Sequence, residues 1–183
     1  MDERDKYHRI VVIGTSCSGK TTLARQLSQQ LHIPHIELDA LHWKPNWVPT
    51  PREELRPLVE NAIAIDNWTL DGNYAATRDL VWSRATTIIW LDYPLHLVLR
   101  RAIRRTFKRV VYREELWNGN RESLRTTLSR DSILVWVLKT YRKNHREYRA
   151  LLPHYKSENP QTQVLIFRSP AETRRYLQTQ SAS

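Results

Sequence analysis

The segment VVIGTSCSGKTTLARQL, residues 11–27, constrains the fold more than any other part of the chain. An apolar, β-branched stretch over residues 9–14 ends at Gly14 and predicts a short buried strand. Leucines at four-residue spacing after Gly19 predict a helix with one apolar face. A strand and a helix joined by a tight glycine loop are typical of a parallel α/β sheet.

The loop itself matches the pattern GxxxxGK[ST] without deviation from Gly14 to Thr21. Its glycines let consecutive backbone N–H groups converge on an anion at the positive end of the following helix. Lys20 is expected to reach the β- and γ-phosphates of a nucleoside triphosphate, and the Thr21 hydroxyl to ligate Mg²⁺. We therefore expect ATP and Mg²⁺ as cofactors. The loop residues expected at the nucleotide are Gly14, Ser16, Cys17, Ser18, Gly19, Lys20, Thr21 and Thr22.

Further apolar stretches predict four more strands, which alternate with helical patterns: residues 34–38, 67–72, 86–94 and 163–167. This alternation predicts one α/β domain with a five-stranded parallel sheet over residues 1–178, followed by a frayed tail over 179–183. Thr50, Pro51 and Glu53 form the pattern of a helix start with Thr50 as the N-cap. The next helix is expected over 94–111, with Leu95, Leu99, Ile103, Phe107 and Val110 buried.

Composition and charge limit the class of protein. The chain has 183 residues, 40% of them hydrophobic, and a single cysteine, so one compact domain in a reducing cytoplasm is expected. No apolar run approaches the length of a membrane span, and no membrane partner is expected. Residues 100–150 carry 15 lysines or arginines against 5 acidic residues, which accounts for the whole net charge of +10. This segment is expected to meet an anionic partner, either a phosphate-bearing small molecule or nucleic acid.

Several acidic residues fall where ligands of a parallel sheet bind, at the carboxyl ends of the strands. Asp39 and Asp71 each follow an expected strand, near the phosphate loop. An aspartate that ends an apolar strand beside this loop commonly assists Mg²⁺ binding, so Asp71 is the second expected metal residue. The alternative is a plain Asp71-Gly72 turn.

Five stretches together resemble the small P-loop kinases of the nucleoside-monophosphate-kinase superfamily: GTSCSGKTTLARQL, LDALHWKPNW, WTLDGNY, IIWLDYP and VLIFRSP. The resemblance spans about residues 9–177 and points above all to adenylate-kinase-like proteins of the type labelled "DNA topology modulation protein". It implies a P-loop NTPase fold with an arginine-bearing lid near residues 112–130. By this resemblance, Asp71 holds Mg²⁺ through water. Arg101 lies over the adenine, Arg105 grips the transferring phosphates, and Ser169 and Pro170 border the base. Further lid arginines would come from Arg121, Arg125 and Arg130.

Two departures from adenylate kinases concern the acceptor. The family follows its aspartate-glycine pair with an arginine that binds the acceptor phosphate, but here Asn73 and Tyr74 follow and the first arginine is Arg78. The family also places an arginine three residues beyond the second-strand aspartate, where this chain has His42, with Lys44 the nearest cation. The clamp for an acceptor phosphate is therefore weakened or rebuilt.

Asp39 bears on the class of acceptor. A hydroxyl acceptor needs a carboxylate that takes its proton, whereas a phosphate acceptor does not. The stretch DALHW also resembles the acceptor side of gluconate-type sugar kinases, where the aspartate contacts a hydroxylated substrate. Asp39 is thus a candidate base, acceptor ligand or partner of Mg²⁺, or else a helix N-cap without catalytic role. The residues expected at the acceptor are Asp39, His42, Trp43, Lys44, Asn73, Tyr74 and Arg78.

The sequence as a whole predicts a phosphotransferase that moves the γ-phosphoryl group of Mg-ATP to a small acceptor, favouring a nucleotide. The expected catalytic residues are Lys20, Asp39, Arg105 and Arg125. One alternative is a kinase for a sugar-like hydroxyl compound, with Asp39 as the base. The other is a nucleic-acid-associated ATP-binding protein, which the basic segment favours.

Overall fold

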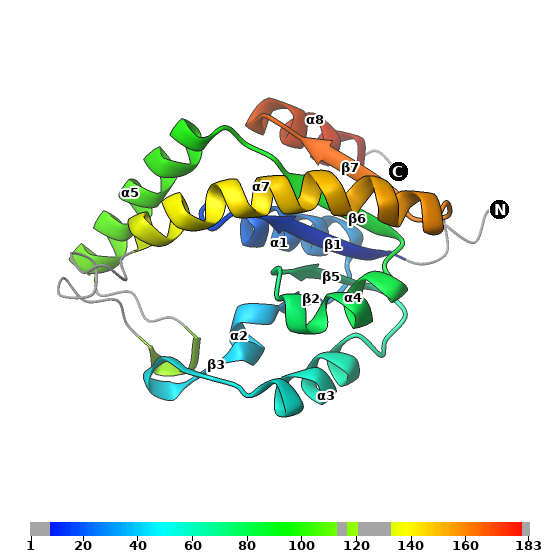
Figure 1. The fold of residues 1–183 in the computed structure, drawn as a ribbon, viewed down its shortest axis with the longest axis horizontal. Coiled ribbons are helices and arrows are strands. Elements are labelled where there is room, and N and C mark those ends of the chain that lie inside the picture. The colour runs from blue at the N-terminus through cyan, green and yellow to red at the C-terminus, as the bar shows by residue number, and fades with distance from the viewer. Residues whose placement is uncertain (1–7, 113–116, 121–132, 181–183) are drawn as a thin grey trace.

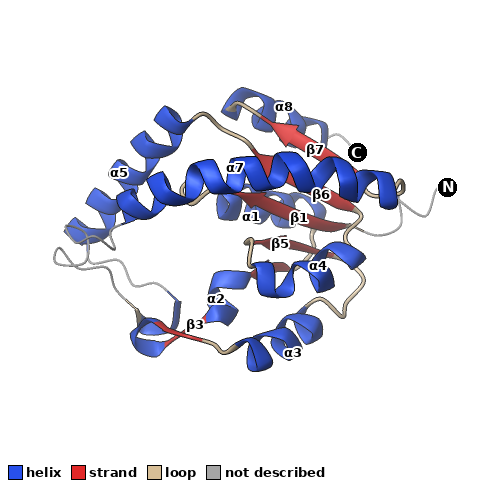
Figure 2. Ribbon diagram, viewed as in Figure 1, coloured by secondary structure: helices blue, strands red, loops and turns tan. Residues whose placement is uncertain are grey.

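A computed structural model describes residues 8–112, 117–120 and 133–180, and its centre is a five-stranded parallel sheet (Figures 1 and 2). The strand order is β2-β5-β1-β6-β7, and every pairing in this sheet is parallel. The sheet confirms the predicted α/β class and all five predicted strands. The observed bounds are Arg9–Gly14 for β1, His35–Glu37 for β2, Trp68–Asp71 for β5, Thr87–Leu91 for β6 and Gln163–Phe167 for β7.

Helices cover both faces of the sheet and make a three-layer arrangement (Figure 1). One face packs against α3 (Arg52–Ala62), α4 (Arg78–Arg84) and α7 (Ile133–Glu158). The other packs against α1 (Lys20–Leu31), the first turns of α5 (Leu95–Tyr112) and α8 (Pro170–Gln180). Because β1 lies in the middle of the sheet, its carboxyl end places the phosphate loop at the centre of one edge, where ligands of such sheets bind.

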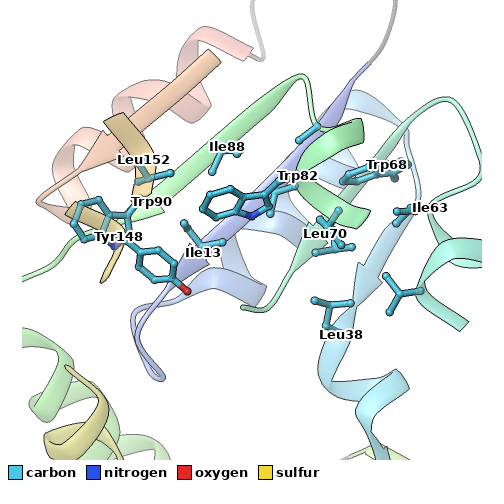
Figure 3. Packing of buried hydrophobic residues seen from close by; sticks show 14 of the residues in the cluster. Ile13, Leu38, Ile63, Trp68, Leu70, Trp82, Ile88, Trp90, Tyr148 and Leu152 are labelled. Carbon is cyan, nitrogen blue, oxygen red and sulfur yellow. The ribbon is translucent and has the colours of Figure 1, made fainter. Parts of the chain in front are cut away.

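Successive side chains of a strand point to opposite faces of the sheet, so the central strand β1 contributes to the apolar clusters on both faces. Val11 and Ile13 belong to the cluster beneath α3, α4 and α7, whereas Ile10 and Val12 belong to the cluster beneath α1 and α8. Trp68, Trp82 and Trp90 are buried, and Figure 3 shows them around the sheet with Tyr148 of α7. Each large apolar side chain buried in this way contributes about 1.5–3 kcal/mol.

The buried face of α5 differs from the predicted one. Ile103 and Phe107 were expected inside but are 56% and 71% exposed, while Val98, Ala102 and Thr106 are buried. The side chain of Val110 lies outside the described residues. The helix is rotated because Arg101, next to the buried face, donates to the backbone of the phosphate loop, a polar contact that hydrophobic periodicity does not register.

The start of α3 also differs from the prediction. Thr50 is not its N-cap, because the N-cap position belongs to Pro51 and no side chain caps the helix. The Thr50 hydroxyl instead donates to the carbonyl of Leu41 at 2.9 Å. At the other end of the chain, α8 continues to Gln180, two residues beyond the expected end of the domain.

Short elements between β2 and α3 form a structure that the sequence did not predict. Leu38, expected as the last residue of a strand, begins a short helix, α2 (Leu38–His42), and an antiparallel hairpin follows. Its strands are β3 (Trp43–Lys44) and β4 (Val48–Pro49), joined by the 3₁₀ turn η2 (Pro45–Trp47). Two further 3₁₀ turns are η3 (Ala75–Thr77) and η4 (Trp117–Gly119). Within the described residues, no helix has the length and apolar character needed to cross a membrane.

Candidate active site

The phosphate loop forms an open cradle between β1 and α1. Gly14 has φ +148°, and a Cβ there would lie 2.9 Å from both the Leu91 carbonyl oxygen and the Ser18 hydroxyl oxygen, so glycine is required. The Ser18 hydroxyl is buried and has no hydrogen-bond partner among the described residues. A buried hydroxyl without a partner is costly unless a ligand supplies one. The cradle therefore fits a phosphate group of ATP.

Lys20 lies where it can neutralise that phosphate. Its Nζ donates to the Thr15 carbonyl at 3.3 Å, across the loop. Burial lowers the pKa of Lys20, Arg105 lowers it further, and Asp39 and Asp71 oppose the shift. Asp39, Asp71 and Arg105 are thus all within electrostatic reach of Lys20.

Thr21 and Asp71 form a pair of oxygen ligands beside the cradle. The Thr21 hydroxyl donates to Oδ2 of Asp71 at 2.5 Å, and Asp71 is only 4% exposed. Hydroxyl and carboxylate oxygens suit Mg²⁺, which keeps several waters and phosphate oxygens rather than an all-protein cage. In the described part of the chain, no group of three or more His, Cys, Asp or Glu could hold a metal ion. The oxygens of Thr21 and Asp71 fit Mg²⁺.

His35 is a site residue that the sequence analysis missed. Its Nε2 lies 2.9 Å from Oδ1 of Asp71, and its Nδ1 lies 3.8 Å from Glu37. His35 and Glu37 both belong to β2, and Glu37 is paired in register with Asp71 of the neighbouring strand β5. The signal that could have found His35 is its place two residues before Glu37, in the strand expected over residues 34–38.

Gly72 is the point at which the chain after β5 meets α2. Gly72 has φ +134°, and a Cβ at this position would lie 2.7 Å from the Cβ of Leu38. The glycine therefore allows α2 to approach β5 closely. This approach brings Asp39, in the first turn of α2, toward the phosphate loop.

Asp39 is held by Tyr74, from the loop after β5. The Tyr74 hydroxyl donates to Oδ1 of Asp39 at 2.5 Å. Burial first, and then the Asp39 charge, raise the pKa of Tyr74, so it stays protonated and remains a donor. The N-cap of α2 is Glu37 and not Asp39, so the N-cap alternative for Asp39 is wrong.

Tyr74, which holds Asp39, belongs to a cluster of aromatic rings. The His42 ring lies 4.3 Å from that of Tyr74 and 4.6 Å from that of Trp43, centroid to centroid. Trp43 in turn meets Trp47 edge-on at 5.6 Å. Burial lowers the pKa of His42, so its ring is neutral near pH 7. We call α2, the β3–β4 hairpin and Tyr74 the acceptor side.

The two cations expected at the acceptor are engaged elsewhere. Lys44 lies 2.6 Å from Glu54 of α3, and Arg78 lies 2.6 Å from Glu147 of α7. Arg78 also stacks over Trp82 and Tyr148. Asn73, expected at the acceptor too, hydrogen-bonds the Tyr148 hydroxyl and lines a small cavity with Tyr74 and Arg78.

The arginines of α5 lie on the phosphate side. Arg101 donates to the Ser18 carbonyl at 2.5 Å and lies 5.0 Å above the Tyr93 ring, so it supports the loop. Arg105, one turn later on α5, lowers the pKa of Lys20 by its charge. The side chains of Arg121, Arg125 and Arg130, and most of the expected lid, fall outside the described residues.

Ser169 and Pro170 begin α8 at the same sheet edge. The Ser169 hydroxyl donates to Glu172 at 2.9 Å and accepts from the Glu172 N–H at 3.3 Å, while the Arg168 N–H donates to Glu172 at 2.8 Å. Ser169 thus caps the start of α8, with Pro170 in the first turn, and Glu172 also holds the backbone of Arg168. It fixes the loop expected to border the adenine.

The turn of residues 117–120, between α5 and α7, is joined to the acceptor side. Trp117 Nε1 donates to Glu37 at 2.8 Å, and the Asn118 amide donates to the Trp43 carbonyl at 2.5 Å. Asn120, 4% exposed, donates to the Lys44 carbonyl at 3.0 Å and accepts from the Trp47 N–H at 2.8 Å. Trp47 adopts φ +57°, a strained conformation for a large side chain, and its hydrogen bond to Asn120 offsets that strain.

Three solved structures share this fold over most of their length. A gluconokinase from Sinorhizobium meliloti 1021 is 19% identical with a TM-score of 0.54, covering 96% of this chain and 91% of its own. A sugar kinase from Janibacter sp. HTCC2649 is 18% identical with a TM-score of 0.50 and the same coverages, 96% and 91%. A shikimate kinase from Bacteroides thetaiotaomicron is 16% identical with a TM-score of 0.51, covering 94% and 95%. No protein-family model matches the sequence, and neither does any curated protein. The chain therefore has the fold of P-loop kinases.

Proposed function

We propose that this protein is a P-loop kinase that transfers the γ-phosphoryl group of Mg-ATP to a hydroxyl group of a small molecule. The observation that carries this proposal is the placement of Asp39, held by the Tyr74 hydroxyl at 2.5 Å and within electrostatic reach of Lys20. A fixed carboxylate beside the phosphate loop is what a hydroxyl acceptor requires as its general base. The fold shared with a gluconokinase, a sugar kinase and a shikimate kinase supports the same reaction class.

In the proposed reaction, Asp39 accepts the proton of the acceptor hydroxyl as its oxygen bonds to the γ-phosphorus. The bond from that phosphorus to the β–γ bridging oxygen breaks, and ADP leaves. Lys20 and Arg105 stabilise the charge that develops on the transferring group. Mg²⁺, held by Thr21 and Asp71, would neutralise the β- and γ-phosphate oxygens. Arg101, Ser169 and Pro170 form the nucleotide side, with the capped start of α8 near the adenine.

The nucleotide acceptor favoured by the sequence is the weaker candidate for this geometry. A nucleoside monophosphate presents a phosphate oxygen that needs no base, and it needs free cations at its phosphate. The cations expected for this purpose, Lys44 and Arg78, are paired with Glu54 and Glu147. The arrangement supports the alternative in which Asp39 serves a hydroxyl.

The proposal is tested by measuring ADP release from Mg-ATP against a panel of acceptors, with Lys20→Ala as the blank. The panel holds nucleosides, nucleoside monophosphates, neutral sugars, gluconate and shikimate. Acceleration by a hydroxyl compound, with a phosphate ester recovered as product, would support the proposal. Acceleration by nucleoside monophosphates alone, with diphosphates as products, would contradict the hydroxyl acceptor and restore the nucleotide one.

A second candidate, an ATP-binding protein that acts on nucleic acid, rests on the exposed surface of α7. This helix carries five exposed cations at helical spacing on one face: Lys139, Arg142, Lys143, Arg146 and Arg149. Such a row fits a phosphate backbone. Binding of duplex DNA that weakens steeply between about 50 and 200 mM salt would support this candidate, and no binding at the lower salt would exclude it.

A further inference from the structure

We propose that the acceptor is an uncharged, hydroxylated ring compound, such as a nucleoside or a neutral cyclic sugar, rather than a phosphate- or carboxylate-bearing one. This inference rests on the proposed function and names its substrate class. Three features of the acceptor side carry it: paired cations, a carboxylate that has no cationic side-chain partner on that side within the part of the chain that the structure describes, and a set of aromatic rings.

Among the described residues, three cations of this region already hold carboxylates. Lys44 lies 2.6 Å from Glu54, Arg78 lies 2.6 Å from Glu147, and Arg25 lies 3.0 Å from Glu37. Arg78 borders the small cavity behind Tyr74, yet its guanidinium is also stacked between Trp82 and Tyr148. An acceptor carboxylate or phosphate would have to displace one of these acidic partners before it gained a cation.

The carboxylate nearest the acceptor side has a neutral partner there. Asp39 is held by the phenol of Tyr74, and the neighbouring His42 ring is neutral because burial lowers its pKa. Lys20 faces Asp39 from the phosphate loop, where the negative charge of ATP would occupy it. An anionic acceptor would therefore meet Asp39 as a like charge in a partly buried site, and such a contact disfavours binding.

The remaining contact surface is aromatic. His42, Tyr74 and Trp43 form a connected set with centroid separations of 4.3 and 4.6 Å. His42 Nδ1 is buried without a hydrogen-bond partner among the described residues, so the set also offers a polar atom to a ligand. Aromatic faces with one neutral polar atom suit a flat base or the apolar face of a sugar ring.

The test compares matched acceptors that differ in one charge: adenosine with adenosine monophosphate, and glucose with gluconate. The rate of ADP release and the phosphorylated product are measured for each. We expect kcat/KM for the neutral member of the productive pair to exceed that of the anionic member by about tenfold or more. Faster ADP release with adenosine would identify a nucleoside acceptor, and faster ADP release with glucose would identify a sugar acceptor.

Other outcomes separate the two proposals. A preference for gluconate, phosphorylated on a hydroxyl group, would overturn the neutral acceptor and leave the hydroxyl kinase standing. Phosphorylation of adenosine monophosphate alone, to the diphosphate, would overturn both. Acceleration by no member of either pair or of the larger panel would also overturn both.

A charge-release variant tests the electrostatic cause. Glu54→Gln removes the partner of Lys44, and its exposed neighbour Glu53→Gln is the matched control. We expect Glu54→Gln to lower the ratio of kcat/KM for the neutral acceptor to that for the anionic acceptor several-fold. Glu53→Gln is expected to leave this ratio at the wild-type value. Glu147→Gln, which releases Arg78, is expected to act in the same direction. If neither Glu54→Gln nor Glu147→Gln changes the ratio of kcat/KM for the neutral acceptor to that for the anionic one, these ion pairs are not the cause of the preference.

Discussion

The side-chain amide of Asn120 donates to the carbonyl of Lys44 at 3.0 Å, across 76 residues of sequence. The same side chain accepts from the Trp47 N–H at 2.8 Å. One buried asparagine thus holds both ends of the β3–β4 turn. Residues 117–120 are in this way part of the acceptor side, although they follow α5 in the chain.

We expect Asn120→Ala to raise the KM for the acceptor several-fold, while the KM for ATP changes little. The substitution leaves a carbonyl and an N–H without partners, which costs about 1–3 kcal/mol and loosens the hairpin that carries Trp43. Steady-state kinetics with each substrate varied in turn checks this. Asn61→Ala, at an exposed position of α3, is the control. An unchanged acceptor KM for Asn120→Ala would remove the turn from the acceptor side.

We expect Tyr74→Phe to lower kcat by about tenfold or more with little change in the KM for ATP. A hydrogen bond to a charged group contributes about 1.5–3 kcal/mol, and its loss frees Asp39 to leave the acceptor hydroxyl. Tyr155→Phe is the matched control, because the Tyr155 hydroxyl donates to the Trp82 carbonyl at 2.5 Å away from the site. Equal kcat values in wild type and Tyr74→Phe would contradict the positioning role of Tyr74.

His35→Leu is expected to raise the Mg²⁺ concentration for half-maximal rate by about tenfold, since residues that orient metal-binding side chains commonly have effects of this size. Glutamine at position 35 keeps a donor for Asp71 and should recover most of the affinity. Direct titration of Mg²⁺ into the ATP-bound protein gives a second measurement. His154→Leu, at an exposed position of α7, is the control. If His35→Leu does not change the Mg²⁺ concentration for half-maximal rate, His35 contributes only to packing.

The value of kcat/KM for ATP is expected to fall at alkaline pH with an apparent pKa below 10.5, the ordinary value for lysine. Burial lowers the pKa of Lys20 in the free protein, so the charged form that binds phosphate persists below this pKa and is lost as pH rises through it. The pKa of Tyr74 is raised, so its hydroxyl remains protonated over the same interval. The profile is measured from about pH 7 to about pH 10. A flat profile over this interval would contradict the lowered pKa.

The sequence predicted the sheet and the phosphate side well because both depend on local patterns. A β-branched run that ends in glycine makes a strand, and GxxxxGK[ST] requires one backbone shape. Lys20, Thr21 and Asp71 were placed together by the rule that strand ends meet at one edge. The same rule identified Asp39 without showing which side chain holds it.

Long-range polar contacts are where the sequence failed. His35 pairs with Asp71 across 36 residues and Asn120 with Lys44 across 76, and neither pairing leaves a periodic pattern. The rotation of α5 has the same origin, since Arg101 bonds Ser18 while the more apolar residues Ile103 and Phe107 stay exposed. The sequence pattern predicted Thr50 as a helix N-cap, but the Thr50 hydroxyl donates to the carbonyl of Leu41 instead. A cap that the sequence did not predict forms at the start of α8, between Ser169 and Glu172.

The most direct test of the account is the acceptor-dependent rate of Asp39→Asn, compared with its ATP affinity and its slow hydrolysis of ATP without acceptor. Asparagine preserves the shape of the side chain and its contact with Tyr74 but cannot take a proton. We predict that acceptor-dependent ADP release falls by about 10²–10⁴-fold, the range for loss of a general base, while ATP affinity and acceptor-free hydrolysis stay close to wild type. An Asp39→Asn protein that phosphorylates its acceptor at the wild-type rate would contradict a hydroxyl acceptor served by Asp39.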